Sequence, residues 1–150
     1  MMEPVAGSPP GRPLSGRDIT IYAAIGLGVW LNGALTFRLG GAFLFESGPA
    51  VTGMVAIFIS VAVCLIFRST MRWRGTRESE ALTVAVIMLL PGLFGEAARQ
   101  SVFSWATGLD IRAEPRFAAI MFLGNAVLIA YALARHLRAR RNLSVPSRTG

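Results

Sequence analysis

Two uninterrupted apolar runs near the start of the chain dictate what it can fold into. Ile19–Phe37 has 19 residues and Ser47–Phe67 has 21, and neither run contains a charged residue. A helix of about 20 residues spans the ~30 Å hydrocarbon core of a bilayer. Because every backbone N–H and C=O group in that medium must be paired within the protein, the two runs predict transmembrane helices.

Two further apolar segments complete a set of four. One covers residues 117–134, between Arg116 and Arg135, and the other covers about 81–106. Charged residues make up 15% of the chain, against about 25% in a typical soluble domain, and the mean hydropathy is +0.55. The predicted fold is therefore an all-α integral membrane protein, a four-transmembrane-helix bundle.

The 81–106 segment differs from the other three because its charge-free part ends at Gly95. Glu96 and Arg99 follow, and the sequence then continues apolar. We expect one helix that carries two charges near its outer third and is kinked at Pro91, since proline removes a backbone hydrogen bond. The alternative is a helix that ends at Glu96 and is followed by an interfacial segment.

The segments outside the spans are polar. Residues 1–17 include four prolines and three glycines and predict a disordered arm. The transmembrane domain is expected at 18–135, a basic tail at 136–150, and a short link at 38–46. A secretory signal is the alternative for the first span, but its 19 residues exceed the usual apolar core of about 7–15, which favours an uncleaved helix.

The distribution of arginine predicts the orientation. Eleven arginines fall on one side of the predicted spans: Arg12, Arg17, Arg68, Arg72, Arg74, Arg77, Arg135, Arg138, Arg140, Arg141 and Arg148. At most four fall on the other: Arg38, Arg99, Arg112 and Arg116. Loops rich in Arg or Lys stay in the cytoplasm, so both termini are expected there (N-in/C-in).

Composition excludes several classes of function. The net charge is +7, but the basic residues adjoin apolar spans, which favours anionic lipid headgroups over nucleic acid as the partner. The single cysteine, Cys64, and the single histidine, His136, cannot form a metal cluster with neighbouring carboxylates, so no metal or cofactor is expected. The chain also lacks a nucleophile–base–acid set, and we expect no enzymatic activity.

Small residues predict how the helices pack. They recur at steps of four in three spans: Ala24, Gly28, Asn32 and Thr36; Thr52, Ala56, Ser60 and Cys64; and Ala126, Ala130 and Ala134. Small residues let helix backbones approach closely in lipid, so these faces are expected to meet in one bundle. Asn32 and Asn125 are expected to hydrogen-bond between helices; the alternative is that they line a small cavity.

Glu96 is the main candidate for a functional site. A charge at the bilayer centre costs about 2.5–3.5 kcal/mol on insertion scales, and intramembrane acids often mark function. Glu96 shares a helix stripe with Gln100 and should face the bundle. Arg99 can pair with it locally, and Arg38, about 6 Å away in helix rise, is expected to contact it. The alternative is a proton or substrate site.

Two motifs resemble a catalogued family. The runs Leu90–Ala97 and Trp30–Gly41 together resemble an uncharacterised family of small bacterial four-helix membrane proteins, domain of unknown function 5367. The resemblance covers about residues 19–134 and implies the four-helix architecture. It also singles out Arg38 and Glu96 as motif residues, without naming a function for them. The chain departs from the family pattern in having Glu96 in place of Asp and Ser104–Gly108 in place of an aromatic–Pro turn.

The expected function follows from these features. We expect a small, multi-pass structural or accessory protein of the bacterial inner membrane, associated with anionic lipid and with a second copy or another membrane protein. The rival is a small oligomeric transporter in which Glu96 couples to a proton or a cation. The two differ in whether Glu96 faces a water-filled cavity or is sealed against an arginine.

Overall fold

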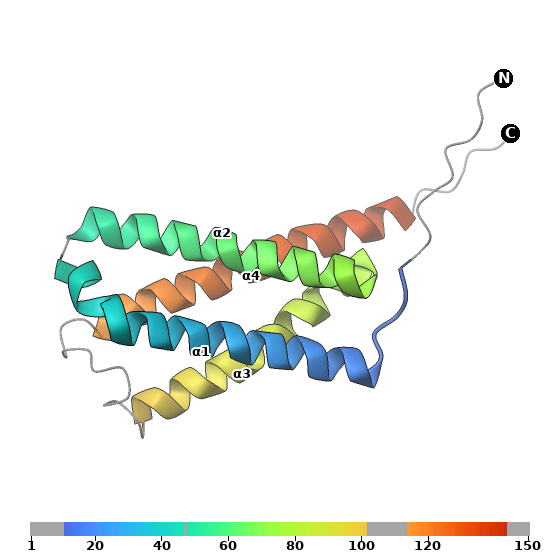
Figure 1. Cartoon of the computed structure of the whole chain (residues 1–150). Coiled ribbons are helices and arrows are strands. Elements are labelled where there is room, and N and C mark those ends of the chain that lie inside the picture. The colour runs from blue at the N-terminus through green and yellow to red at the C-terminus, as the bar shows by residue number, and fades with distance from the viewer. Residues whose placement is uncertain (1–10, 47, 102–113, 144–150) are drawn as a thin grey trace, which may run out of the picture.

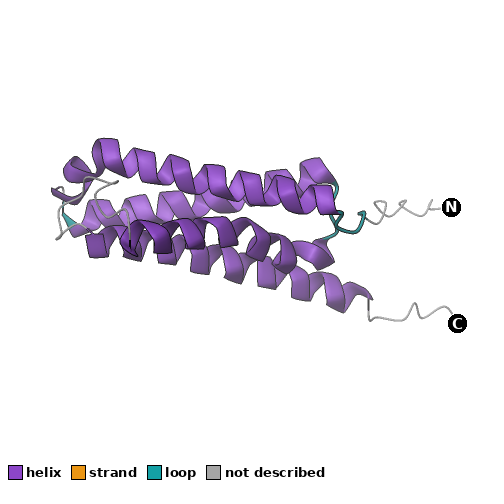
Figure 2. Cartoon of the chain, turned by 90° about the horizontal axis from the view of Figure 1, so that it is seen from below, coloured by secondary structure: helices purple, strands orange, loops and turns teal. Residues whose placement is uncertain are grey.

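The computed structural model describes residues 11–46, 48–101 and 114–143. Its elements are α1 (Gly16–Glu46), α2 (Pro49–Arg74), the short 3-10 helix η1 (Glu78–Glu80), α3 (Ala81–Ser101) and α4 (Glu114–Leu143). In this described part, α1, α2, α3 and α4 are each long and apolar enough to cross a membrane. They lie side by side in one elongated bundle (Figures 1 and 2).

The four predicted spans are helical, but their limits differ from the prediction. The predicted link at 38–46 is wrong, since α1 continues to Glu46. This stretch contains no proline, and a helix keeps its backbone groups paired even where glycine occurs. α3 runs through Pro91 and past Glu96 to Ser101, so the alternative of a helix ending at Glu96 is also wrong. Residues 102–106 of the predicted span lie outside the described residues.

Local sequence signals fix where these helices begin and end. Pro49 is in the first turn of α2, where its missing N–H group is not needed. After Arg74, Gly75 adopts a left-handed conformation with φ of 63°. The N–H of Gly75 then donates to the carbonyl of Arg72, and the N–H of Thr76 to that of Met71, both at 3.1 Å. This Schellman arrangement turns the chain sharply towards η1 and α3.

The helices associate as two pairs. α1 packs most extensively on α3 and α2 on α4, while α3 and α4 join the pairs. α1 and α2 touch less than any of these (Figure 1). The start of α1, the turn from α2 to α3 and the end of α4 share one end of the bundle, called here the clasp end; the opposite end is called the ion-pair end.

α1 and α3 approach each other closely at Gly26. A Cβ atom on Gly26 would lie 1.8 Å from the backbone oxygen of Met88, so only glycine fits there. Further along, the indole of Trp30 covers Gly92 and Gly95, and a Cβ on Gly95 would lie 2.9 Å from the ring. Glycine thus lets α1 and α3 pack backbone against backbone and ring against backbone.

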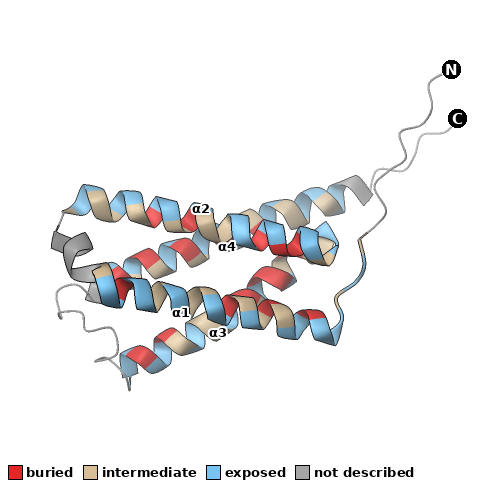
Figure 3. Ribbon diagram, in the orientation of Figure 1, coloured by how far each residue is buried: buried red, intermediate tan, exposed pale blue. Residues whose placement is uncertain are grey.

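Two apolar clusters fill the interior, one towards each end. The first contains Tyr22, Phe67, Met71, Ala81, Val84, Ala85, Met88, Leu89, Leu128 and Ala132. The second contains Phe37, Ala56, Phe117 and Ile120. Much of the surface of each helix is exposed (Figure 3), and these exposed faces carry large apolar side chains such as Leu39, Phe58 and Phe94. An apolar surface of this extent suits lipid or another membrane protein.

The predicted small-residue faces are correct for one helix only. On α2, Ala56 and Ser60 are buried, as expected. On α1 the stripe of Ala24, Gly28, Asn32 and Thr36 is exposed, and on α4 the stripe of Ala126, Ala130 and Ala134 is exposed. The prediction was wrong for α1 because the opposite face, with Tyr22 and Gly26, packs on α3.

Two glycines of α1, Gly26 and Gly28, provide a matched test of the α1–α3 packing. Gly26→Ala should destabilise the protein by about 1–3 kcal/mol, because the added methyl group must push Met88 and its helix away. Gly28→Ala should be neutral or slightly stabilising, since no atom lies within 4 Å of the position that its Cβ would take. Thermal unfolding in detergent measures both changes, and equal melting temperatures would contradict the packing described.

Candidate functional site

Glu96 forms a buried ion pair with Arg99, one turn further along α3. Arg99 Nη2 lies 2.7 Å from Glu96 Oε1, and Arg99 Nε donates to Oε2 at 3.0 Å. The side chains of Glu96 and Arg99 are 7% and 3% exposed respectively. Two parallel N–H···O bonds of this kind fix the relative orientation of the groups as well as neutralising their charges. The local pairing expected from the sequence is therefore present.

Neighbouring side chains complete the site. Gln100 Nε2 donates to Glu96 Oε1 at 2.9 Å. The indole of Trp30, seated on Gly92 and Gly95, lies near the same carboxylate, although its buried N–H has no hydrogen-bond partner among the described residues. The carboxylate of Glu96 is thus surrounded by protein groups from α3 and α1.

The guanidinium of Arg99 also contacts an aromatic ring. It lies 4.9 Å from the ring centre of Phe117, on α4, in a cation–π arrangement. Phe117 in turn meets Phe37 of α1 edge to face, with ring centres 4.7 Å apart. Three helices therefore contribute to the surroundings of Arg99 at the ion-pair end, and the pair is part of the packing between them.

The predicted contact between Arg38 and Glu96 is wrong. Among the described residues no ion pair joins these two side chains, and the partner of Glu96 is Arg99. The side chain of Arg38 is exposed on α1, whereas the preceding residue, Phe37, is buried against α4. A step of about 100° between successive helix residues carries Arg38 away from the buried face that Phe37 occupies. Arg99 reaches Glu96 from the same helix instead.

The other predicted site residues lie elsewhere. Asn32 and Asn125 line a groove between α1 and α2, and neither Glu96 nor Arg99 is among the residues that line it. Of the six predicted site residues, the structure thus brings together Glu96, Arg99 and Gln100, and places the two asparagines in a separate cavity. Trp30 lines this groove and also lies near Glu96, so its ring stands between the two features.

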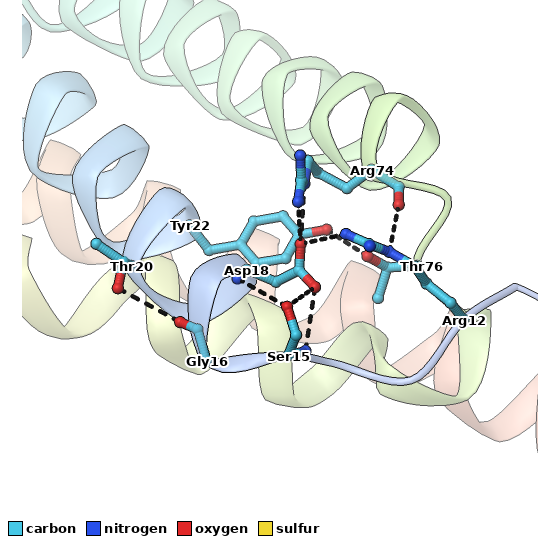
Figure 4. A network of polar contacts seen from close by, with 8 residues as sticks. All are labelled: Arg12, Ser15, Gly16, Asp18, Thr20, Tyr22, Arg74 and Thr76. Atoms are coloured by element: carbon cyan, nitrogen blue, oxygen red, sulfur yellow. Dashed lines mark hydrogen bonds and ion pairs between the residues drawn. The ribbon is translucent and has the colours of Figure 1, made fainter.

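A second buried acid, Asp18, was missed from the sequence. Its carboxylate accepts hydrogen bonds from Arg12 Nη2 at 2.7 Å, from Arg74 Nη2 at 2.5 Å, and from the backbone N–H and hydroxyl of Ser15 at 3.0 and 2.6 Å (Figure 4). The side chain is 1% exposed. We call Arg12, Ser15, Asp18 and Arg74 the polar clasp. It ties the start of α1 to the end of α2.

The clasp has a recognisable sequence signal. Ser15 and Asp18 stand three residues apart at the start of α1, as in a capping box, where the two side chains satisfy each other's backbone N–H groups. Backbone pairing of Arg12 with Gly75 and a hydrogen bond between Tyr22 Oη and Thr76 Oγ1 at 2.6 Å strengthen the same junction. These residues join the start of α1 to the turn that follows α2.

Another pair of contacts joins η1 to α4 at the clasp end. Glu78 forms an ion pair with Arg135, whose Nη1 also donates to Tyr131 Oη at 2.8 Å. His136 Nδ1 contacts the backbone oxygen of Ser79. No group of three or more metal-ligating side chains occurs among residues 11–46, 48–101 and 114–143.

A double-mutant cycle tests the Glu96–Arg99 pair. Glu96→Gln or Arg99→Met alone should cost about 3–5 kcal/mol, because each leaves one buried charge without its partner. The double variant should cost less than the sum of the two. The measurement is thermal or denaturant unfolding in detergent.

The control is the cycle of Arg38→Met with Glu96→Gln, which should be additive within about 0.5 kcal/mol because Arg99, and not Arg38, binds the Glu96 carboxylate. Strong coupling in the control cycle, or additivity in the Arg99 cycle, would contradict the assignment of Arg99 as the partner.

Comparison with known proteins gives a family but no activity. A family model described as a family of unknown function, DUF5367, matches residues 43–138, more than half of the chain. This segment includes Glu96 and Arg99, whereas Trp30 and Arg38 precede it. No curated protein and no solved structure matches the chain. The resemblance predicted from the sequence is thus confirmed, and the chain belongs to the DUF5367 family of unknown function.

Proposed function

We propose that this protein is a structural or accessory protein of the bacterial inner membrane, without enzymatic activity of its own. The observation that carries the proposal is the closed environment of Glu96. Its two oxygens are bonded to Arg99 and Gln100, and the side chain is 7% exposed. Glu96 also takes no part in lining the groove.

A coupling site for a proton or a cation has different requirements. The acid must exchange its ligand with water on one or both sides of the membrane, and it must change its charge during the cycle. The charge of a carboxylate that accepts two parallel bonds from a buried guanidinium is already balanced by that group. The geometry therefore supports a stabilising role for Glu96 better than it supports transport.

Charge distribution supports an orientation and a lipid partner. The clasp end gathers the described arginines Arg12, Arg17, Arg68, Arg72, Arg74, Arg77, Arg135, Arg138, Arg140 and Arg141, whereas Arg38, Arg99 and Arg116 are at the ion-pair end. We infer that the clasp end faces the cytoplasm, where exposed arginines near the membrane each add about 1 kcal/mol of attraction to anionic headgroups.

Site-directed labelling tests this orientation. A cysteine introduced at Thr76 or Arg138 in a Cys64→Ala background should be protected from a membrane-impermeant maleimide in intact cells, and a cysteine at Arg38 should react. Permeabilised cells provide the control for intrinsic reactivity. Labelling of the Thr76 or Arg138 site from outside would reverse the proposed orientation.

Reconstitution in liposomes tests the accessory role against transport. Vesicles containing the protein should show proton and potassium fluxes equal to those of protein-free vesicles, with either the wild type or Glu96→Gln, because the acid is sealed. An added ionophore is the positive control and establishes that the assay responds to proton and potassium flux. A flux in the wild type that Glu96→Gln abolishes, while the variant stays folded, would establish the transporter instead.

A further inference from the structure

The groove between α1 and α2 is a cavity of about 720 Å³. Its walls are apolar side chains such as Val55 and Phe58, and α3 and α4 form its floor with small residues such as Gly92 and Gly124. No charged side chain lines it within the described part of the chain. Its size falls in the range of about 300–1,000 Å³ that is typical of small-molecule sites.

Two carboxamides face this apolar space without partners. Asn32 on α1 and Asn125 on α4 both line the groove, and neither side chain makes a hydrogen bond within residues 11–46, 48–101 and 114–143. Asn32 stands eight residues before Gly40, and Asn125 nine residues after Arg116, at the same end of the two candidate spans. Both are thus about 12–14 Å of helix rise from the span ends, and at a similar depth.

A ligand for this space can be specified from its chemistry. A carboxamide in hydrocarbon without a hydrogen bond is costly, which favours an occupant that offers an acceptor oxygen to the N–H groups at that depth. Ester groups of bilayer phospholipids lie at the interface, near the span ends, and their acyl chains carry no oxygen. A transmembrane helix pairs its backbone oxygens within itself, so it offers few free acceptors to the two carboxamides.

We propose that the groove binds an uncharged, lipid-soluble carbonyl compound, of which an isoprenoid quinone is an example. The N–H groups of Asn32 and Asn125 donate to its carbonyl oxygens, and its apolar ring and chain lie between α1 and α2. The exposed, uncrowded surface of α1 at Gly28 and Thr36 leaves the entrance open towards the lipid. Such a site is compatible with an accessory or a transport role. A negative result in the binding assay therefore overturns the groove as a site without deciding the flux assay, and the flux result does not decide the site.

Quenching of tryptophan fluorescence tests the proposal, because Trp30 lines the groove. The full-length protein carrying Trp73→Phe and Trp105→Phe, placed in lipid nanodiscs, retains Trp30 as its single tryptophan. Titration with decylubiquinone should quench Trp30 saturably, and an alkylbenzene without oxygen should fail to compete. Asn32→Leu and Asn125→Leu should each weaken quinone binding roughly three- to tenfold. Each variant loses one hydrogen bond to the ligand, of the strength found for hydrogen bonds between transmembrane helices.

Two further variants separate occupancy of the groove from folding. Gly28→Leu places a side chain in the open groove and should abolish saturable quenching. Ala24→Leu, one turn earlier on the same helix and outside the lining, should leave it unchanged. Circular dichroism and thermal unfolding establish that both variants are folded.

Three results would overturn the site. The first is quenching that rises linearly with quinone and is equal in all variants, which reports partitioning into lipid. The second is a stable dimer that Asn32→Leu dissociates, which shows that a second copy covers the carboxamide. The third is co-purification of phospholipid that Gly28→Leu removes, without saturable quinone binding, which shows that an acyl chain fills the groove.

Discussion

The backbone contact between α1 and α3 at Gly26 is the interaction on which the arrangement of the helices depends. Within a bilayer, apolar side chains gain nothing by leaving lipid for protein, so helices must be held by close packing and by polar bonds. Gly26 allows α1 to reach the backbone of Met88, and the same approach seats Trp30 on Gly92 and Gly95. This orientation of α1 turns Ala24, Gly28 and Asn32 away from α3 and creates one wall of the groove.

Polar bonds complete the fold at its two ends, and each end uses them differently. At the clasp end, Asp18 links segments far apart in the sequence, because Arg12 and Arg74 both bind its carboxylate. At the ion-pair end, Glu96 and Arg99 neutralise each other within a single helix and join it to α4 through the Phe117 ring. Buried ion pairs add little net stability over apolar packing, but removing one partner leaves a buried charge uncompensated, so each carboxylate depends on the guanidinium that binds it.

The sequence was sufficient to predict which segments form helices, but not which face of each helix is buried in the bundle. Long charge-free runs have one solution in lipid, so the four helices followed directly, and an acid and a base three residues apart made the Glu96–Arg99 pair predictable. The rotation of α1 was not predictable, because small residues occur on two of its faces and only contact with Met88 selects Gly26 over Gly28. Arg38 was assigned to Glu96 from helix rise alone, without the angle that separates it from Phe37. The Ser15–Asp18 capping box could be predicted from the sequence, but the hydrogen bond from Arg74, 56 residues further along, could not.

The polar clasp also bears on the order in which the protein assembles. The chain is made from its N-terminus, so Asp18 and the whole of α1 precede Arg74 and the turn at Gly75. Until α2 has been synthesised and has returned to the side on which α1 began, the carboxylate lacks one of its two guanidinium partners. The start of α1 therefore cannot be fixed to the end of α2 until the first hairpin is complete. Arg74, the last residue of α2, supplies the missing guanidinium to Asp18.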